Sequence, residues 1–239
     1  MLPHQLSISA FTTAKYPDDP APNEDAFAID RWRGLIALSD GASESFDSAT
    51  WARALVEQFV RNPHFDATWL QTACTRYSAA HDREALSWSA QAAYDRGSYA
   101  TLIGFALHRD RCMVDVLGIG DSLAMLIDGS TLVDSFPYTD AAQFKCRPLL
   151  LCTAQSQNGR FITGDARRRF LRTWALSKLK QPTVLCMTDA LGAWCLSAPS
   201  RRLPILLRIK KQDQFVRLVT RERATGMMRR DDTTLVRVS

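Results

Sequence analysis

Acidic side chains stand repeatedly where short apolar segments of the chain begin or end. Three follow such a segment and two pairs precede one: Asp40, Asp121 and Asp189, then Glu24-Asp25 and Asp231-Asp232. Strand ends that meet at one edge of a sheet bring distant residues together, and carboxylates gathered in a low-dielectric cleft repel one another strongly. Only cations could hold such a cluster together, and all-oxygen ligand sets suit hard ions such as Mg²⁺ or Mn²⁺. Two such ions a few ångströms apart, bridged by one Asp and a water, would lower the pKa of that water and make it a nucleophile.

The bland alternative is that these residues only shape turns. Asp is common at strand ends because it favours turns, so one such residue indicates nothing. Five sites share this context here, and a small residue follows three of them: Gly41, Ser122 and Ala190. The pattern alone slightly favours a metal site over turns.

The elements that would position these residues are short strands and amphipathic helices. Alternating or apolar runs predict strands over 6–12, 26–29, 35–38, 99–107, 112–119, 123–127, 131–133, 183–187 and 233–238. Helical spacing predicts helices over 52–60, from an N-cap at Asp66 to about Tyr94 with a break near 81–88, and over 167–179 and 212–223. The fold class is therefore mixed, with hairpin-rich sheets covered by long helices.

No linker rich in Pro, Gly or Ser marks a domain boundary, so we expect a single domain over residues 1–239. Periodicity is weaker over 136–182, which we interpret as an inserted flap. The hydrophobic content of 46% and charged content of 23% exclude a disordered chain. No apolar run approaches the ~18 residues of a membrane span, and the start of the chain lacks the pattern of a signal peptide. We expect a cytoplasmic protein with no membrane partner.

Histidine and cysteine chemistry is poorly supported. The six cysteines form no CxxC pair and have mostly apolar neighbours, which is typical of core thiols in a reducing compartment. The four histidines are not spaced as ligand pairs, so a His-based metal site or a structural zinc site is not expected.

Charge is unevenly distributed along the chain, although the net charge is only +5. The first 120 residues hold 15 acidic and 10 basic side chains, and the remainder holds 10 acidic and 20 basic ones. Arg160, Arg167–Arg169, Arg172, Lys178 and Lys180 form a basic stretch. A solvated helix face is the favoured interpretation, and a substrate-facing flap that attracts acidic or phosphorylated protein is the functional alternative.

Five short motifs occur in order along the chain, preceded in the third case by Gly97–Thr101. They are Asn23-Glu24-Asp25-Ala26, Ser39-Asp40-Gly41-Ala42, Gly120-Asp121-Ser122, Thr188-Asp189-Ala190-Leu191-Gly192 and Asp231-Asp232-Thr233-Thr234-Leu235. Together they resemble the successive motifs of metal-dependent PP2C-type (PPM) protein serine/threonine phosphatases, in a divergent, bacterial-like form. The resemblance runs from about residue 5 to residue 238. Each motif is weak alone, and the order and spacing make the set specific.

The resemblance implies an α+β fold, a four-layer α-β-β-α sandwich of two mainly antiparallel sheets flanked by helices. It also implies a centre of two Mn²⁺ or Mg²⁺ ions, with a third, looser ion in many members. The implied ligands are Glu24, Asp40, the carbonyl of Gly41, Asp121, Asp189 and Asp231. Asp40 would bridge the two principal ions, Asp121 with Asp189 would hold the third, and Asp25 would orient a metal-bound water. Asp25, Asp40 and Asp189 are thus the implied catalytic residues.

The implied reaction is attack of a metal-bridged hydroxide on the phosphorus of phosphoserine or phosphothreonine, without a phosphoenzyme. A phosphorylated protein would be the substrate, and a cognate Ser/Thr kinase is an implied partner. Pro20 stands where many members carry an Arg that binds substrate phosphate, and Ala42–Ser45 replaces the usual glycines, so no substrate-binding residue is assigned.

Two other functions stay open, and these departures motivate the first of them. One is a catalytically weak or inactive PP2C-like protein that binds a phosphoprotein or kinase. The other is a nucleic-acid-binding protein or nuclease, which rests only on the basic second half. That function is disfavoured because stacking aromatics do not accompany the basic residues.

Overall fold

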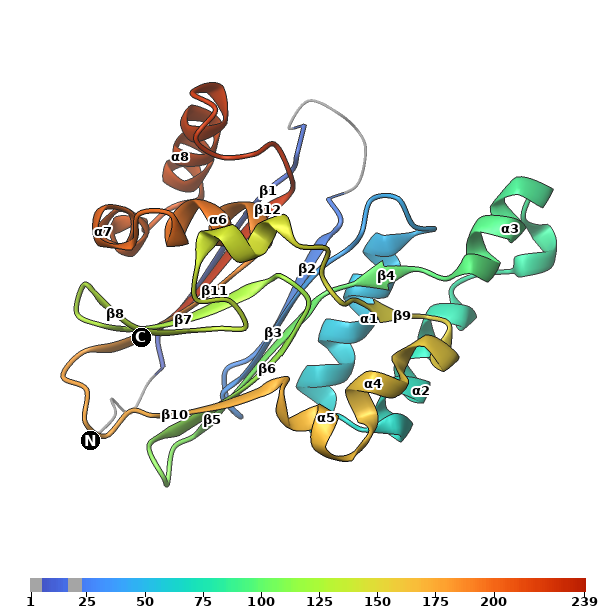
Figure 1. Cartoon of the computed structure of the whole chain (residues 1–239), viewed down its shortest axis with the longest axis horizontal. Helices are drawn as coiled ribbons and strands as arrows, with labels where there is room; N and C mark the ends of the chain where they lie inside the picture. Colours follow the sequence, from blue (N-terminus) through green and yellow to red (C-terminus); the bar gives the residue numbers. More distant parts are fainter. Residues whose placement is uncertain (1–5, 17–22) are drawn as a thin grey trace.

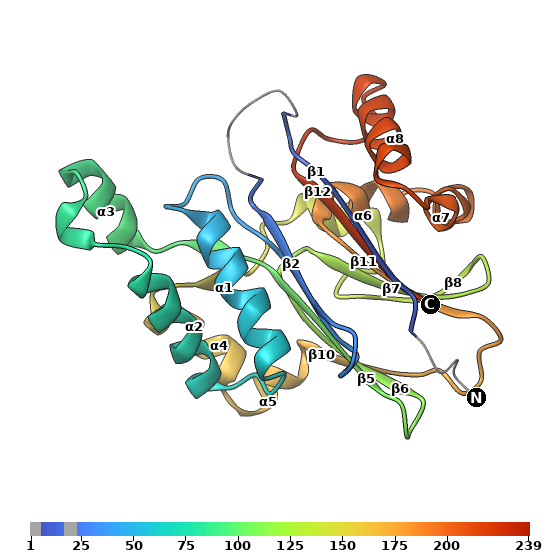
Figure 2. The ribbon, with the colours of Figure 1, turned by 180° about the vertical axis from the view of Figure 1, so that it is seen from behind.

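Two five-stranded antiparallel sheets pack face to face in the computed structural model, which describes residues 6–16 and 23–239 (Figure 1). The strand orders are β1-β12-β11-β7-β8 in the first sheet and β10-β6-β5-β3-β2 in the second. Helices cover both outer faces, as the views from front and back agree (Figures 1 and 2). The expected α+β, four-layer α-β-β-α sandwich is confirmed.

The strands lie where the apolar runs of the sequence predict them, with two exceptions, β9 and β10. The first sheet consists of β1 (Ile8–Thr13), β12 (Thr233–Val238), β11 (Pro182–Met187), β7 (Leu123–Asp128) and β8 (Thr131–Phe136). The second consists of β10 (Leu171–Ala175), β6 (Met113–Ile119), β5 (Leu102–His108), β3 (Leu35–Asp40) and β2 (Asp25–Asp30). A small ribbon pairs β4 (Tyr99–Ala100) with β9 (Leu151–Cys152).

Two groups of helices form the outer layers. The second sheet is covered by α1 (Ser48–Arg61) and α2 (Ala67–Ala79), and the first by α6 (Asp189–Leu196), α7 (Pro199–Arg208) and α8 (Gln212–Ala224) (Figure 2). Near the β4–β9 ribbon lie α3 (Trp88–Arg96) and α4 (Gly159–Ile162), and α5 (Gly164–Arg168) follows α4 toward the ends of α1 and α2 (Figures 1 and 2). The Asp66 side chain caps α2 by accepting the amide of Trp69 at 2.7 Å, as the sequence predicts. No helix among the described residues is both long and apolar enough to span a membrane.

Three apolar layers hold the sandwich together. Between the sheets lie residues such as Ile36, Leu38, Phe105 and Val236, all nearly inaccessible to solvent. Separate layers lie under α1 and α2 and under α6 to α8. Burial of these side chains removes apolar area from water, which is the dominant favourable term in folding. The rigid sandwich therefore fixes the ends of its strands, where the acidic residues lie.

The helix expected over 167–179 is wrong. The chain leaves α5 after Arg168 and forms the strand β10, which pairs antiparallel with β6 and places Trp174 opposite Val114. Trp174 is the one buried side chain of β10, so the strand shows little of the alternation that identifies strands in a sequence. Pairing with the otherwise open edge of β6 outweighs the local helical spacing.

The segment 136–182 contains mostly short elements. From Ala141 it forms 3₁₀ turns over Ala141–Lys145 and Gln155–Asn158, then α4 and α5, and it ends beyond β10. The part up to α5 lies outside the two large sheets, whereas β10 is an edge strand of the second sheet.

Trp174 links the two sheets at this edge. Its indole Nε1 donates to Asp134 Oδ2 of β8 at 2.8 Å, and its side chain is 4% exposed. We expect Trp174→Phe to lower the free energy of unfolding by about 1–3 kcal/mol, because the partly buried carboxylate of Asp134 loses one of its donors. Urea unfolding of the variant measures this loss. Trp32→Phe is the control, since Trp32 is 95% exposed. Equal losses of unfolding free energy in the two variants would contradict the role of Trp174 in linking the two sheets.

Candidate metal centre

A cavity of about 430 Å³ opens at one end of the sandwich. Four of the predicted acidic residues line it: Asp40, Asp121, Asp189 and Asp231. Asp40 ends β3, Asp121 follows β6, Asp189 begins α6 directly after β11, and Asp231 precedes β12. The topology therefore gathers carboxylates from four separate parts of the chain, as the strand-end argument predicts.

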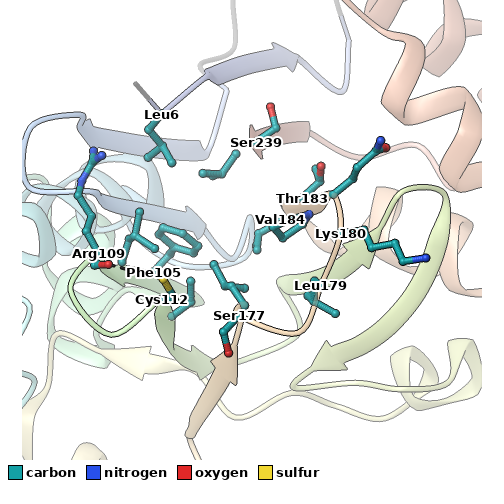
Figure 3. Close-up of a pocket in the computed structure, with 16 residues that line it drawn as sticks. Leu6, Phe105, Arg109, Cys112, Ser177, Leu179, Lys180, Thr183, Val184 and Ser239 are labelled. Carbon is teal, nitrogen blue, oxygen red and sulfur yellow. Dashed lines mark hydrogen bonds between the residues drawn. The ribbon is translucent and has the colours of Figure 1, made fainter. Parts of the chain in front are cut away.

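A second cavity, of about 550 Å³, opens at the opposite end of the same strands (Figure 3). It is bordered by Val184 near the start of β11 and by Val238 at the end of β12. Its described lining contains no Asp or Glu and is largely apolar, with Arg109 and Lys180 as its basic members. Carboxylate chemistry therefore belongs to the first cavity.

Asp25 and Asp40 face each other as partners in the register of β2 and β3. Asp25 Oδ2 accepts hydrogen bonds from Thr234 Oγ1 at 2.7 Å and Thr188 Oγ1 at 3.1 Å, while Oδ1 is buried without a described partner. Burial raises the pKa of Asp25 to about 8; the charges of Asp232 and Asp231 add to the rise, and the two hydroxyls oppose it. Without an added cation, Asp25 therefore favours its protonated form near neutral pH.

The same repulsion acts on the other members of the cluster. Burial raises the pKa of Asp40 well above its ordinary value, and the charges of Asp25, Asp121 and Asp231 raise it further. Burial also raises the pKa of Asp121. The positive charge of Arg229 opposes this rise and lowers the pKa of both carboxyls. The site is thus short of positive charge.

Arg229 is the one cation among the described residues that line this cavity. Its guanidinium donates to Asp189 Oδ2 and lies 3.1 Å from Asp231 Oδ2, while half of its side chain (51%) stays exposed. Asp189 Oδ1 is buried and has no described partner. Arg229 therefore neutralises part of the cluster and leaves the rest uncompensated.

Glu24 is placed beside the cavity and does not line it. Its carboxylate accepts hydrogen bonds from the hydroxyls of Ser43 and Ser48. Its backbone is fixed by Asp232, whose carboxylate accepts the amide of Glu24 at 2.6 Å. Gly41 does line the cavity, and a Cβ there would come within 2.9 Å of Ser48, so the start of α1 packs directly against it.

The oxygen atoms of these acidic residues are of the type that binds a divalent cation, although the side chains do not converge on one point. Within 6–16 and 23–239, no three His, Cys, Asp or Glu side chains converge as a ready metal-ligand group. Two of the acids, Asp189 and Asp231, are paired with the guanidinium of Arg229. The donors are nevertheless all oxygen, and one buried oxygen each of Asp25 and Asp189 has no hydrogen-bond partner among the described residues. Such a set suits Mg²⁺ or Mn²⁺.

Several hydroxyls that the sequence reasoning missed position these acids. Thr101 Oγ1 accepts the amide of Asp40 at 2.9 Å and lies 2.6 Å from Ser122 Oγ, next to Asp121. Thr188 and Thr234 hold Asp25 from the neighbouring sheet. Their position in the sequence could have identified them, since each of these hydroxyl residues stands in or beside one of the acidic motifs. Pro20 lies outside the described residues.

Comparison with known proteins supports the fold. No family model and no curated protein matches the chain. Solved structures do: photosystem II phosphatase PBCP aligns over 98% of both chains with 14% identity and a TM-score of 0.62. Serine/threonine phosphatase Stp1 from Staphylococcus aureus covers 98% of this chain and 94% of its own, with 14% identity and a TM-score of 0.64. The catalytic domain of serine/threonine protein phosphatase PstP, in complex with two manganese ions, covers 98% of both chains with 17% identity and a TM-score of 0.60.

The chain therefore has the PP2C fold of these serine/threonine phosphatases. This confirms the resemblance of the motifs at the level of the fold, and the roles of individual residues stay predictions.

The raised pKa of Asp25 predicts an unusual pH dependence for the protein in chelator. Its pKa is near 3.8 in the unfolded chain and about 8 in the folded one, so between these values the folded state retains a proton that the unfolded state releases. Stability from this group is complete below about pH 4 and is lost as the pH rises through about 8, by on the order of a few kcal/mol. Urea unfolding near pH 5 and pH 8 measures the loss. Asp25→Asn should show a smaller loss, and a wild-type stability that rises over this range would contradict the assignment.

Proposed function

We propose that this protein is a Mn²⁺- or Mg²⁺-dependent phosphatase that hydrolyses phosphoserine or phosphothreonine in proteins. The observation that carries the proposal is the buried cluster of carboxylates around one cavity, with Arg229 as the sole cation of its described lining. The PP2C fold supports it. A phosphoprotein produced by a cognate Ser/Thr kinase in the cytoplasm is the substrate this activity implies.

The chain would hold two ions through Asp40, Asp189, Asp231 and the carbonyl of Gly41, with Asp121 and Asp189 available to a third. Glu24 joins this set if its carboxylate exchanges its two serine partners for an ion. Divalent cations in this cavity would neutralise a phosphate dianion and lower the pKa of water enough to make it a nucleophile near neutral pH.

The remaining chemistry falls to the protein's own side chains. Asp25 holds or releases a proton at its partnerless Oδ1, while Thr188 and Thr234 fix its orientation. Arg229, half exposed in the cavity wall, can contact an entering anion and is our candidate for the phosphate contact that Pro20 cannot provide. Phe144 and Pro148 are apolar members of the cavity lining.

Hydrolysis assays test this function directly. We expect p-nitrophenyl phosphate and a phosphothreonine peptide to be hydrolysed with Mn²⁺ or Mg²⁺, and activity to disappear in chelator and return with excess metal. Asp40→Asn and Asp189→Asn should each lower kcat by roughly 100-fold or more, because each removes a carboxylate that would hold a cation against the reacting phosphate. Asp110→Asn, in an exposed turn, is the control and should retain full activity.

Two results would count against the proposal. Hydrolysis that persists in chelator would exclude a metal-dependent reaction. Phosphopeptide binding without turnover would favour the alternative, an inactive PP2C-like protein that binds a phosphoprotein or kinase.

Arg229 makes a separate prediction about metal affinity. Its guanidinium competes with a cation for Asp189 and Asp231, so we expect Arg229→Gln to bind Mn²⁺ more tightly, on the order of tenfold. Calorimetric titration of the chelated and dialysed protein measures this affinity. Arg230→Gln is the matched control, because the Arg230 guanidinium lies over the Tyr16 ring, 5.5 Å from its centroid. Weaker binding by Arg229→Gln would show that the guanidinium does not compete.

A further inference from the structure

A third cavity, of about 460 Å³, adjoins the candidate metal centre. The two cavities share four lining residues: Ala42, Glu44, Pro148 and Leu150. A polypeptide that places one residue in the metal centre can therefore continue past these residues into the neighbouring cavity. An extended chain advances about 3.3 Å per residue, so side chains a few positions from a residue in the metal centre would reach this cavity.

Three arginines from separate elements line this cavity: Arg96 at the end of α3, Arg147 in the loop before β9, and Arg160 in α4. All three are exposed, and no guanidinium among them has a hydrogen bond or ion pair with any described residue. We refer to this cavity, with Arg96, Arg147 and Arg160 in its lining, as the arginine pocket.

The acidic residue next to Arg96 in the chain is already paired with another arginine. Asp95, next to Arg96 in the chain, is bound by Arg83, whose Nε lies 2.7 Å from Asp95 Oδ1. Asp95 is therefore already neutralised. Glu44 is the only carboxylate in the described lining of the pocket, so the lining carries an excess of two positive charges.

Tyr99 connects two of the segments that line the arginine pocket. The Tyr99 hydroxyl bonds to Gln157 Oε1 at 2.9 Å and to the carbonyl of Arg96 at 3.3 Å. These contacts tie the end of α3 to the segment that carries Arg160. The three arginines therefore surround a cavity whose lining is cross-linked by Tyr99, and their charged ends are available to a ligand.

We propose that the arginine pocket binds Asp or Glu side chains that flank the phosphorylated residue of the substrate protein. This inference rests on the proposed function and names the class of substrate. The planar guanidinium presents paired donors that match a carboxylate. Without such a pocket, an acidic flank would be repelled by the carboxylates of the metal centre, and the arginines reverse that repulsion on one side of the cavity.

Binding of paired peptides tests the pocket without depending on turnover. Two fluorescent peptides carry the same non-hydrolysable phosphonate in place of phosphothreonine, with either Glu or Ala at the flanking positions. Fluorescence anisotropy in Mn²⁺ should show the Glu peptide binding the wild-type protein about tenfold more tightly. In the triple variant Arg96→Gln, Arg147→Gln, Arg160→Gln, this ratio should fall to about one. Hydrolysis of p-nitrophenyl phosphate and the melting temperature should be unchanged in the variant.

A matched triple variant controls for net charge. Arg53→Gln, Arg201→Gln and Arg208→Gln remove the same charge from exposed positions on α1 and α7, and the tenfold ratio should persist. A wild-type protein without preference for the Glu peptide, or an equal loss of preference in the control variant, would overturn the pocket. Absence of p-nitrophenyl phosphate hydrolysis by the wild type would instead overturn the proposed function, while the binding ratio still decides the role of the pocket.

Discussion

Repulsion between buried carboxylates at one end of the sandwich is the constraint on which the rest of the site depends. Asp25, Asp40 and Asp121 each have a pKa raised by burial, and the negative charges of neighbouring carboxylates raise it further. An arrangement of this kind costs folding free energy, and it is tolerated because the apolar layers behind the strands supply far more. Strongly perturbed carboxylates in a cleft are typical of functional sites, where such strain serves binding or chemistry.

Acidic and basic parts of the sequence converge on this end of the molecule. The first half of the chain contributes Asp25 and Asp40, and the basic second half contributes Asp189 together with Arg147 and Arg229. The charge split of the sequence therefore does not separate an acidic from a basic unit. It reflects an acidic centre assembled from both halves and bordered by arginines, which suits a substrate whose phosphate needs cations and whose flanks are acidic.

Local patterns were sufficient for most of the fold and for the identity of the acidic cluster. Apolar runs located the paired strands because β pairing buries one face of each, and Asp66 marked the start of a helix because its side chain satisfies a free amide. β10 could not be predicted, since its partner β6 is distant in sequence and Trp174 alone among its residues is buried. Thr188 and Thr234 hold Asp25 across the two sheets, and such contacts depend on packing that no local spacing encodes.

Proton release on metal binding tests the central claim most directly, because a carboxyl such as Asp25, whose pKa is raised to about 8, must lose its proton when a cation makes its charged form favourable. Mn²⁺ is titrated calorimetrically into the chelated and dialysed protein at pH 7, in two buffers with different enthalpies of ionisation. The account predicts uptake of at least two ions per chain, with a buffer-dependent heat that corresponds to release of about one proton or more. Absence of Mn²⁺ uptake, or uptake whose heat is the same in both buffers, would contradict it.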